Sequence, residues 1–337
     1  MTTPCISTRA TQTGRSRVNA LEPGHILSGR QPVWVPVCLG ASLHFTVMEG
    51  PELSLTLIPA TDILLMMTAG LLVTGIVAGL LAGLLGVGGG IVIVPVLFLL
   101  FGYLDVPESI IMHMAVATSL ATIIPISLSS AREHYRRGAV DMAVFRHWSP
   151  FMLVAAGLAA AASGKLDSRY LQLLFGVIAI YVALTMIRGK TSAADAAPET
   201  SEIAATGRGV RGGIISALIG AASSLMGIGG GSIAVPVLSA LALPVHRAVG
   251  TAATFGFLIA VPGALGFIWA GLDVEGRLPF SLGFVNVPAA IIIFSTSLFT
   301  VPLGSRIAHA LNPKGLRRAF GFFLLLSAAN IMSGVIT

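Results

Sequence analysis

Charged side chains are scarce in this chain. Only 10% of its 337 residues are Asp, Glu, Lys or Arg, whereas soluble globular domains carry roughly 25%. Eight stretches of 18 or more residues contain none of the four, among them 63–104 and 212–246. This composition cannot supply a water-soluble surface, and uncharged apolar stretches of this length predict membrane-spanning helices. The stretches are continuous rather than alternating in hydropathy, which excludes β-barrel spans.

Cysteine and buried carboxylates are almost missing as well. Cys5 and Cys38 are the only cysteines, and both precede the first apolar stretch. A disulfide framework, a thiolate metal site and a redox motif are therefore not expected in the membrane, and we predict no metal and no cofactor. The uncharged spans disfavour a carboxylate proton relay. No Walker A sequence is present, so ATP is not the direct energy source.

The net charge of +6 does not indicate nucleic-acid binding. Its basic residues lie in short loops between apolar stretches, as they do in cytoplasmic loops of membrane proteins. The expected surroundings are a lipid bilayer, and we predict a multi-pass protein of the inner cell membrane.

What the chain does contain is a glycine-rich segment that occurs twice. Residues 79–97 and 220–238, which we call the first and second glycine cassettes, are identical at 10 of 19 aligned positions. Two further blocks recur in the same order: 113–118 matches 246–251, and 166–171 matches 311–316. The ordered recurrence of Gly, Pro and His indicates an internal duplication.

The duplication predicts an all-α polytopic membrane protein built from two homologous repeats of about five apolar elements each. We expect an N-terminal extension at 1–61, repeats at 62–188 and 212–337, and a cytoplasmic linker at 189–211. Residues 1–47 do not resemble the rest, and one hypothesis is that translation starts at Met48. The expected elements are 62–86, 91–103, 110–131, 147–164, 170–188, 212–227, 232–243, 248–271, 280–303 and 319–336. Two of them, 91–103 and 232–243, are too short to span alone, since about 20 helical residues are needed. They are expected to be halves of glycine-broken hairpins.

Loop charges predict how the chain is oriented. The loops 132–146, 188–211 and 304–318 each hold several Lys or Arg residues, whereas 104–109 holds acids and no base. The three basic loops are expected in the cytoplasm and 104–109 outside. An odd number of elements per half then makes the two repeats inverted relative to each other.

The repeated glycines predict a binding site for an anion. Each glycine triplet is expected to interrupt a helix and to leave backbone groups unpaired. Because unpaired backbone groups are costly in lipid, such a break must line a cavity or be buried in protein. The helix that follows each break offers free N–H groups and the positive end of its dipole, which attract anions. The alternative is that the glycines only allow tight helix packing. Two cassettes in corresponding positions favour a transporter site.

The residues assigned to this site come from both cassettes and from the helices after them. They are Gly86, Gly88, Gly89, Gly90, Pro95, Gly227, Gly229, Gly230, Gly231, Ser232 and Pro236, with the hydroxyls of Thr118, Ser119 and Thr251. Such hydroxyls often bond only to their own helix, which is the alternative for them. His113 and His246 recur in register and could couple transport to protons. An interfacial or capping role is the alternative for both histidines.

Two copies of the pattern G-hydrophobic-GGG-x₄-P, each followed by a helix containing A-V-[AG]-T, resemble the TauE/SafE or sulfite exporter family. The resemblance runs from about residue 65 to the C-terminus. It implies a secondary transporter of sulfite, sulfonates or related sulfur-containing anions, and it maps the family's glycine motif onto Gly86, Gly88–Gly90 and Pro95, and onto Gly227, Gly229–Gly231 and Pro236. The sulfur chemistry comes from the resemblance alone.

Other functions stay open at this point. An anion channel would share the same helices. An intramembrane hydrolase would need a nucleophile beside a base, and Ser232 has no partner at a diagnostic spacing, so no enzymatic activity is expected. The predicted partner is a small anionic solute, and a homo-oligomer is neither required nor excluded.

Overall fold

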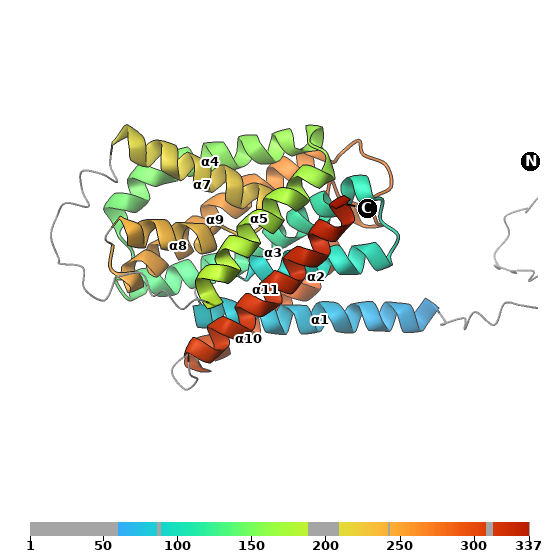
Figure 1. The fold of residues 1–337 in the computed structure, drawn as a ribbon, viewed down its shortest axis with the longest axis horizontal. Coiled ribbons are helices and arrows are strands. Elements are labelled where there is room, and N and C mark those ends of the chain that lie inside the picture. Colours follow the sequence, from blue (N-terminus) through green and yellow to red (C-terminus); the bar gives the residue numbers. More distant parts are fainter. Residues whose placement is uncertain (1–59, 86–88, 188–208, 242, 308–312, 337) are drawn as a thin grey trace, which may run out of the picture. The chain divides into compact units, whose positions relative to one another are not determined.

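The computed structural model describes residues 60–85, 89–187, 209–241, 243–307 and 313–336. Within these ranges the chain forms ten α-helices, one 3-10 helix and one small β-hairpin (Figure 1). The first half contains α1 (Ala60–Leu85), α2 (Gly90–Tyr103), α3 (Glu108–Arg136), α4 (Met142–Ala162), the 3-10 helix η1 (Ser163–Lys165) and α5 (Ser168–Ile187). The second half contains α7 (Val210–Met226), α8 (Gly231–Ala240), α9 (Val245–Ala270), β1 (Ser281–Leu282), β2 (Val285–Asn286), α10 (Val287–Ile307) and α11 (Pro313–Ile336).

These helices correspond to the ten apolar elements expected from the sequence. The main difference is at 280–286, which was expected to begin a helix and instead forms the antiparallel hairpin β1–β2 before α10 starts at Val287. The linker expected at 189–211 and the extension at 1–61 lie almost wholly outside the described residues.

Length and composition identify an all-α membrane protein. Four of the described helices, α3, α5, α9 and α10, are long and apolar enough to cross a bilayer. Large apolar side chains are exposed on several helices, such as Leu158 on α4, Leu218 on α7 and Phe299 on α10. Exposed apolar surface of this extent is stable against lipid tails and would be unfavourable in water.

The short helices begin inside the bundle. α2 has 14 residues and α8 has 10, so at 1.5 Å per residue they extend about 21 and 15 Å, less than the roughly 30 Å hydrocarbon layer. This agrees with the expectation that neither helix crosses the membrane alone.

Each half is packed against the other rather than on itself. The most extensive contacts join α1 to α10, α4 to α7 and to α9, α3 to α9, and α5 to α11. Every one of these pairs takes one helix from each half. If α1 corresponds to α7 and α4 to α10, as the duplicated blocks imply, exchange of the halves turns α1–α10 into α7–α4 and keeps α3–α9 and α5–α11, whereas α4–α9 is more extensive than its counterpart α10–α3.

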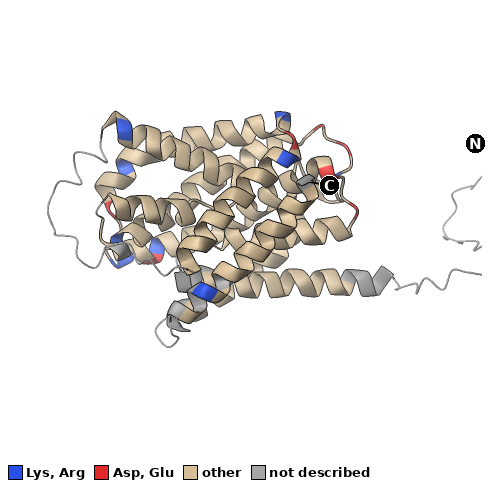
Figure 2. Cartoon of the chain, viewed as in Figure 1, with Lys and Arg blue, Asp and Glu red and all other residues tan. Residues whose placement is uncertain are grey.

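The helix ends gather at two opposite sides of the bundle. The α3–α4 connection, the end of α5 and the start of α7, and the α8–α9 connection lie on the left in Figure 1. The α2–α3, α4–α5 and α9–α10 connections and the C-terminal end of α11 lie on the right. Basic residues prevail on the left and acidic residues are concentrated on the right (Figure 2).

Candidate functional site

The two glycine cassettes adopt the same backbone conformation where they are described. Gly89, at the start of α2, has φ 70° and ψ −20°, and Gly230, at the start of α8, has φ 80° and ψ −27°. A side chain in this left-handed region costs roughly 1–2 kcal/mol, so both positions favour glycine. The duplicated sequence thus produces the same left-handed residue before both short helices.

The two breaks meet inside the bundle. A β-carbon built on Gly90 would lie 2.5 Å from the Gly227 carbonyl oxygen and 3.1 Å from the Ile228 α-carbon. On the other side of the contact, a β-carbon on Gly227 would lie 3.0 Å from a methyl of Val94 and 3.0 Å from the Val116 carbonyl oxygen. Only glycine allows backbones to approach this closely. The two breaks are therefore in direct backbone contact at Gly90 and Gly227.

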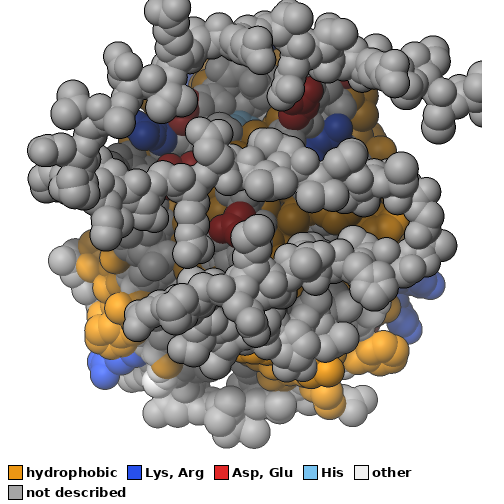
Figure 3. Space-filling model, turned by 90° about the vertical axis from the view of Figure 1, so that its right-hand side faces the viewer, with side chains coloured by type: hydrophobic (Ala, Val, Ile, Leu, Met, Phe, Trp, Pro, Cys, Tyr) orange, Lys and Arg blue, Asp and Glu red, His pale blue; other side chains and the backbone are white. Residues whose placement is uncertain are grey.

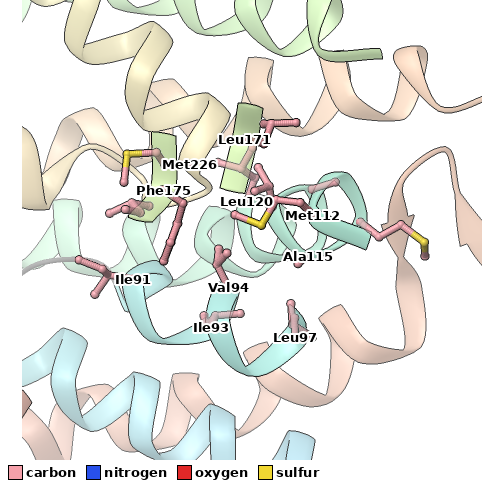
Figure 4. Packing of buried hydrophobic residues seen from close by; sticks show 14 of the residues in the cluster. Ile91, Ile93, Val94, Leu97, Met112, Ala115, Leu120, Leu171, Phe175 and Met226 are labelled. Atoms are coloured by element: carbon pink, nitrogen blue, oxygen red, sulfur yellow. The ribbon is translucent and has the colours of Figure 1, made fainter. Parts of the chain in front are cut away.

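A dry apolar layer surrounds the first turns of α2. Ile91 and Val94 belong to a buried cluster with Leu120 of α3, Phe175 of α5 and Met226 of α7 (Figure 4). This layer fixes the start of α2 against both halves.

The second break is held between α3 and α9. α7 ends in a Schellman turn, in which the Gly227 N–H donates to the Ser224 carbonyl and the Ile228 N–H donates to the Ser223 carbonyl, each at 3.2 Å. Gly229 faces Ile123 of α3, and Gly230 faces Ile259 of α9, whose terminal methyl lies 2.5 Å from a β-carbon built there. A side chain added in this break would therefore press against both α3 and α9.

The predicted hydroxyls of Ser119, Thr118 and Thr251 form hydrogen bonds between segments that are distant in the sequence. Ser119 donates to the Gly227 carbonyl at 2.8 Å. Thr118 accepts from the backbone N–H of Asn286 at 3.0 Å, just before α10, and Thr251 accepts from the backbone N–H of Asp141 at 2.9 Å, just before α4. Asn286 and Asp141 then cap the starts of α10 and α4 with their own side-chain oxygens. Corresponding threonines thus hold corresponding helix starts in the opposite half.

Two serine hydroxyls at the second break have no partner. The Ser223 and Ser232 Oγ atoms are buried and form no hydrogen bond with the described residues. Ser223, in the last turn of α7, was not among the predicted site residues. The alignment of the two cassettes could have pointed to Ser223, because Ser223 and Ser232 are hydroxyl residues where the first cassette has Ala82 and Ile91.

The remaining predicted residues lie in different places. Pro95 is buried in α2, whereas Pro236 is exposed on α8. Gly231 is the buried first residue of α8, and Gly86 and Gly88 lie outside the described residues.

The two histidines are not brought together. His113 is buried, its Nε2 lies 3.0 Å from the Ser163 carbonyl oxygen, and its ring stacks on Phe284 with centroids 5.0 Å apart. His246 is exposed at the start of α9. The contact of His113 with the end of the α4–η1 segment corresponds to the capping alternative.

A separate pocket of about 610 Å³ opens at the end of the bundle on the right of Figure 1. Its lining includes Asp105 and Glu108, beside Gln172. The space-filling view of this end shows acidic side chains among apolar surface (Figure 3). Carboxylates repel an anion, so this pocket does not compete with the glycine breaks as an anion site. No group of three or more His, Cys, Asp or Glu residues suited to a metal ion occurs in the described part of the chain.

Comparison with known proteins identifies the family. The family model described as "Sulfite exporter TauE/SafE" matches residues 71–331. A probable membrane transporter protein of Haemophilus influenzae is 35% identical over 264 residues, covering 77% of this chain and 96% of the relative. Probable membrane transporter proteins of Methanocaldococcus jannaschii (28% identical, covering 76% of this chain and 94% of the relative) and Bacillus subtilis (YunE; 30% identical, covering 65% and 83%) are also similar. No solved structure matches. Because the match spans both glycine cassettes and the helices α3 and α9 that follow them, the chain belongs to the sulfite exporter TauE/SafE family and is a multi-pass membrane transporter.

Proposed function

We propose that the chain is a secondary transporter of small anions, in particular sulfite, sulfonates or related sulfur-containing anions. The observation that carries the proposal is the buried contact between the two glycine breaks, in which Gly90 at the start of α2 lies against Gly227 at the end of α7. Discontinuous helices that start inside the bundle at a repeat interface are the usual substrate sites of secondary transporters.

The chemistry of the breaks favours an anion. Each short helix directs the N–H groups of its first turn and the positive end of its dipole toward the break. Among the described residues, the buried polar side chains include no Asp, Glu, Lys or Arg. Binding would then rely on backbone and hydroxyl donors, which suit a singly charged solute that must also be released.

Alternating access is the mechanism that we infer for this arrangement. Exchange of the halves turns the α1–α10 contact into α7–α4 and keeps α3–α9 and α5–α11, and Thr118 and Thr251 make equivalent contacts between the halves. Both features support inverted repeats that rock about a central site. The charge distribution of the loops supports placing the α3–α4 and α5–α7 connections in the cytoplasm and the protein in the inner membrane.

The proposal is tested by flux into proteoliposomes. Radiolabelled sulfite, sulfate, thiosulfate and a small sulfonate are compared, with and without a pH gradient. Saturable flux that is accelerated by unlabelled anion on the opposite side is expected for a transporter, whereas a channel gives no such acceleration. Gly230→Leu should abolish flux, and Gly138→Leu, at an exposed glycine with an open surrounding and a φ of 66°, is its matched control. Absence of flux for every anion with folded protein would contradict the proposal.

A further inference from the structure

The buried hydroxyls of this protein divide into two groups. Most are hydrogen-bonded: Ser224 donates to the Ala156 carbonyl at 3.0 Å, Ser216 to Gly213 at 2.8 Å and Ser297 to Gly75 at 2.8 Å. Ser223 and Ser232 form no hydrogen bond with any described residue, although Ser223 is fully buried and Ser232 is only 6% exposed. A buried hydroxyl without a partner is unfavourable by several kcal/mol in an apolar medium, so two of them at one break need an explanation.

The two hydroxyls flank the start of α8. Ser232 is the second residue of α8, where backbone N–H groups have no intrahelical acceptor. The Ser223 Oγ lies 3.9 Å from a β-carbon built on Gly230, the residue that precedes α8. The end of α7 thus brings the Ser223 hydroxyl beside the residue that precedes α8, and Ser232 lies in the first turn of α8 itself.

The first cassette has no equivalent. Its residues aligned with Ser223 and Ser232 are Ala82 and Ile91, and the Ile91 side chain is packed in the apolar cluster of Figure 4. Gly89 and Gly230 have the same backbone conformation, but of the two cassettes only the second carries hydroxyl side chains.

We propose that the transporter has a single, asymmetric oxyanion seat at the start of α8, in which the Ser223 and Ser232 hydroxyls and the first N–H groups of α8 bind the oxygens of one small anion. The proposal rests on the proposed function and specifies its substrate class: an anion with several acceptor oxygens on one atom, as in sulfite or a sulfonate. The contact of Gly90 with Gly227 makes the first cassette the wall of the seat rather than a second binding site.

Two isoleucines cover the seat. Ile123 of α3 lies against Gly229 and Ile259 of α9 lies against Gly230. Because one belongs to each half, a movement of α3 relative to α9 would open the seat toward one side or the other.

The test combines stability with binding. Ser223→Ala and Ser232→Ala remove hydroxyls that have no partner, so the melting temperature of the ligand-free protein should stay the same or rise. Binding of radiolabelled sulfite and of methanesulfonate to the purified protein should weaken about tenfold or more for each variant, because a hydrogen bond to a charged group is lost. The stabilisation that sulfite confers on the wild type should shrink accordingly.

Two controls keep the outcome specific. Ser216→Ala lies in the same helix α7 and removes a satisfied hydroxyl, so it should lower the melting temperature while leaving sulfite affinity within about twofold. Ser232→Thr retains the hydroxyl and should restore most of the affinity. Chloride, which has no oxygen atoms to accept separate hydrogen bonds from these donors, should compete poorly with sulfite.

The outcomes separate the two proposals. If the wild type binds and transports sulfite but Ser223→Ala and Ser232→Ala bind it as tightly as Ser216→Ala does, the seat is wrong and the transport proposal stands. If both serine variants are destabilised without ligand, their hydroxyls have a structural role and the seat is again wrong. If the wild type moves no anion at all, the transport proposal fails and the seat fails with it.

Discussion

At the scale of the residue, single atoms decide how closely the two halves approach. Gly230 combines a φ of 80° with a neighbour, the Cδ1 atom of Ile259, that would lie 2.5 Å from any β-carbon. Gly138 has a similar φ of 66° and nothing within 4 Å. Comparing substitutions at Gly230 and Gly138 therefore separates the energetic cost of a left-handed backbone from the cost of a clash with α9.

We predict that Gly230→Ala destabilises the protein more than Gly138→Ala does. Gly138→Ala should lose roughly 1–2 kcal/mol of unfolding free energy from backbone strain alone, and Gly230→Ala should lose about 1–3 kcal/mol more from overpacking. Unfolding in mild detergent measures both. Adding Ile259→Val, which deletes the clashing methyl, should recover part of the loss in Gly230→Ala and none in Gly138→Ala. Equal losses in the two single variants would show that packing against α9 is unimportant.

At the scale of the element, α3 and α9 each hold the start of a helix in the other half. Thr118 of α3 accepts from the backbone before α10, and Thr251 of α9 accepts from the backbone before α4. Both threonines are fully buried, so removing either hydroxyl leaves a backbone N–H group, buried at Asn286 and partly buried at Asp141, without its acceptor.

We predict that Thr118→Val and Thr251→Val each lower the unfolding free energy by about 1–3 kcal/mol, the usual effect of an unsatisfied buried donor. Thr254→Val is the matched control, because its hydroxyl donates only to Thr251 in the same helix, and its loss should be well below 1 kcal/mol. Thr118→Ser and Thr251→Ser should stay near the wild type in the same detergent unfolding assay. A loss in Thr254→Val as large as in the other two would contradict these roles.

The sequence predicted the helices and the breaks but not these long-range contacts. Uncharged apolar stretches and paired Gly-Gly-Gly segments are local signals, so the bounds of α2 and α8 followed within a few residues. The hairpin at 281–286 was missed because its two-residue strands leave no periodic pattern. The partner of Thr118 lies 168 residues away, and no local pattern could indicate it. The unpaired state of Ser223 likewise follows only from what surrounds it in space.

At the scale of the whole molecule, the question is whether the halves face opposite ways. Tyr103 ends α2 and His246 follows α8 at the start of α9, so they lie just after the two corresponding short helices. In Figure 1 these two segments are at opposite sides of the bundle. A duplication without inversion would place them on the same side. Tyr135, near the end of α3, lies on the same side as the α8–α9 connection.

We predict that cysteines at these positions react from opposite sides of the membrane. Cys5 and Cys38 are first replaced by serine, and Tyr103→Cys, Tyr135→Cys or His246→Cys is then introduced at a side chain that is exposed in each case. A membrane-impermeant maleimide added to intact cells should label position 103 and leave 135 and 246 unlabelled, because loop charge predicts that the side of the α3–α4 connection faces the cytoplasm. Permeabilised cells should label all three, which controls for accessibility. Labelling of 103 and 246 from the same side would rule out inverted repeats, and with them the rocking mechanism, because two halves that face the same way cannot expose one central site to each side in turn.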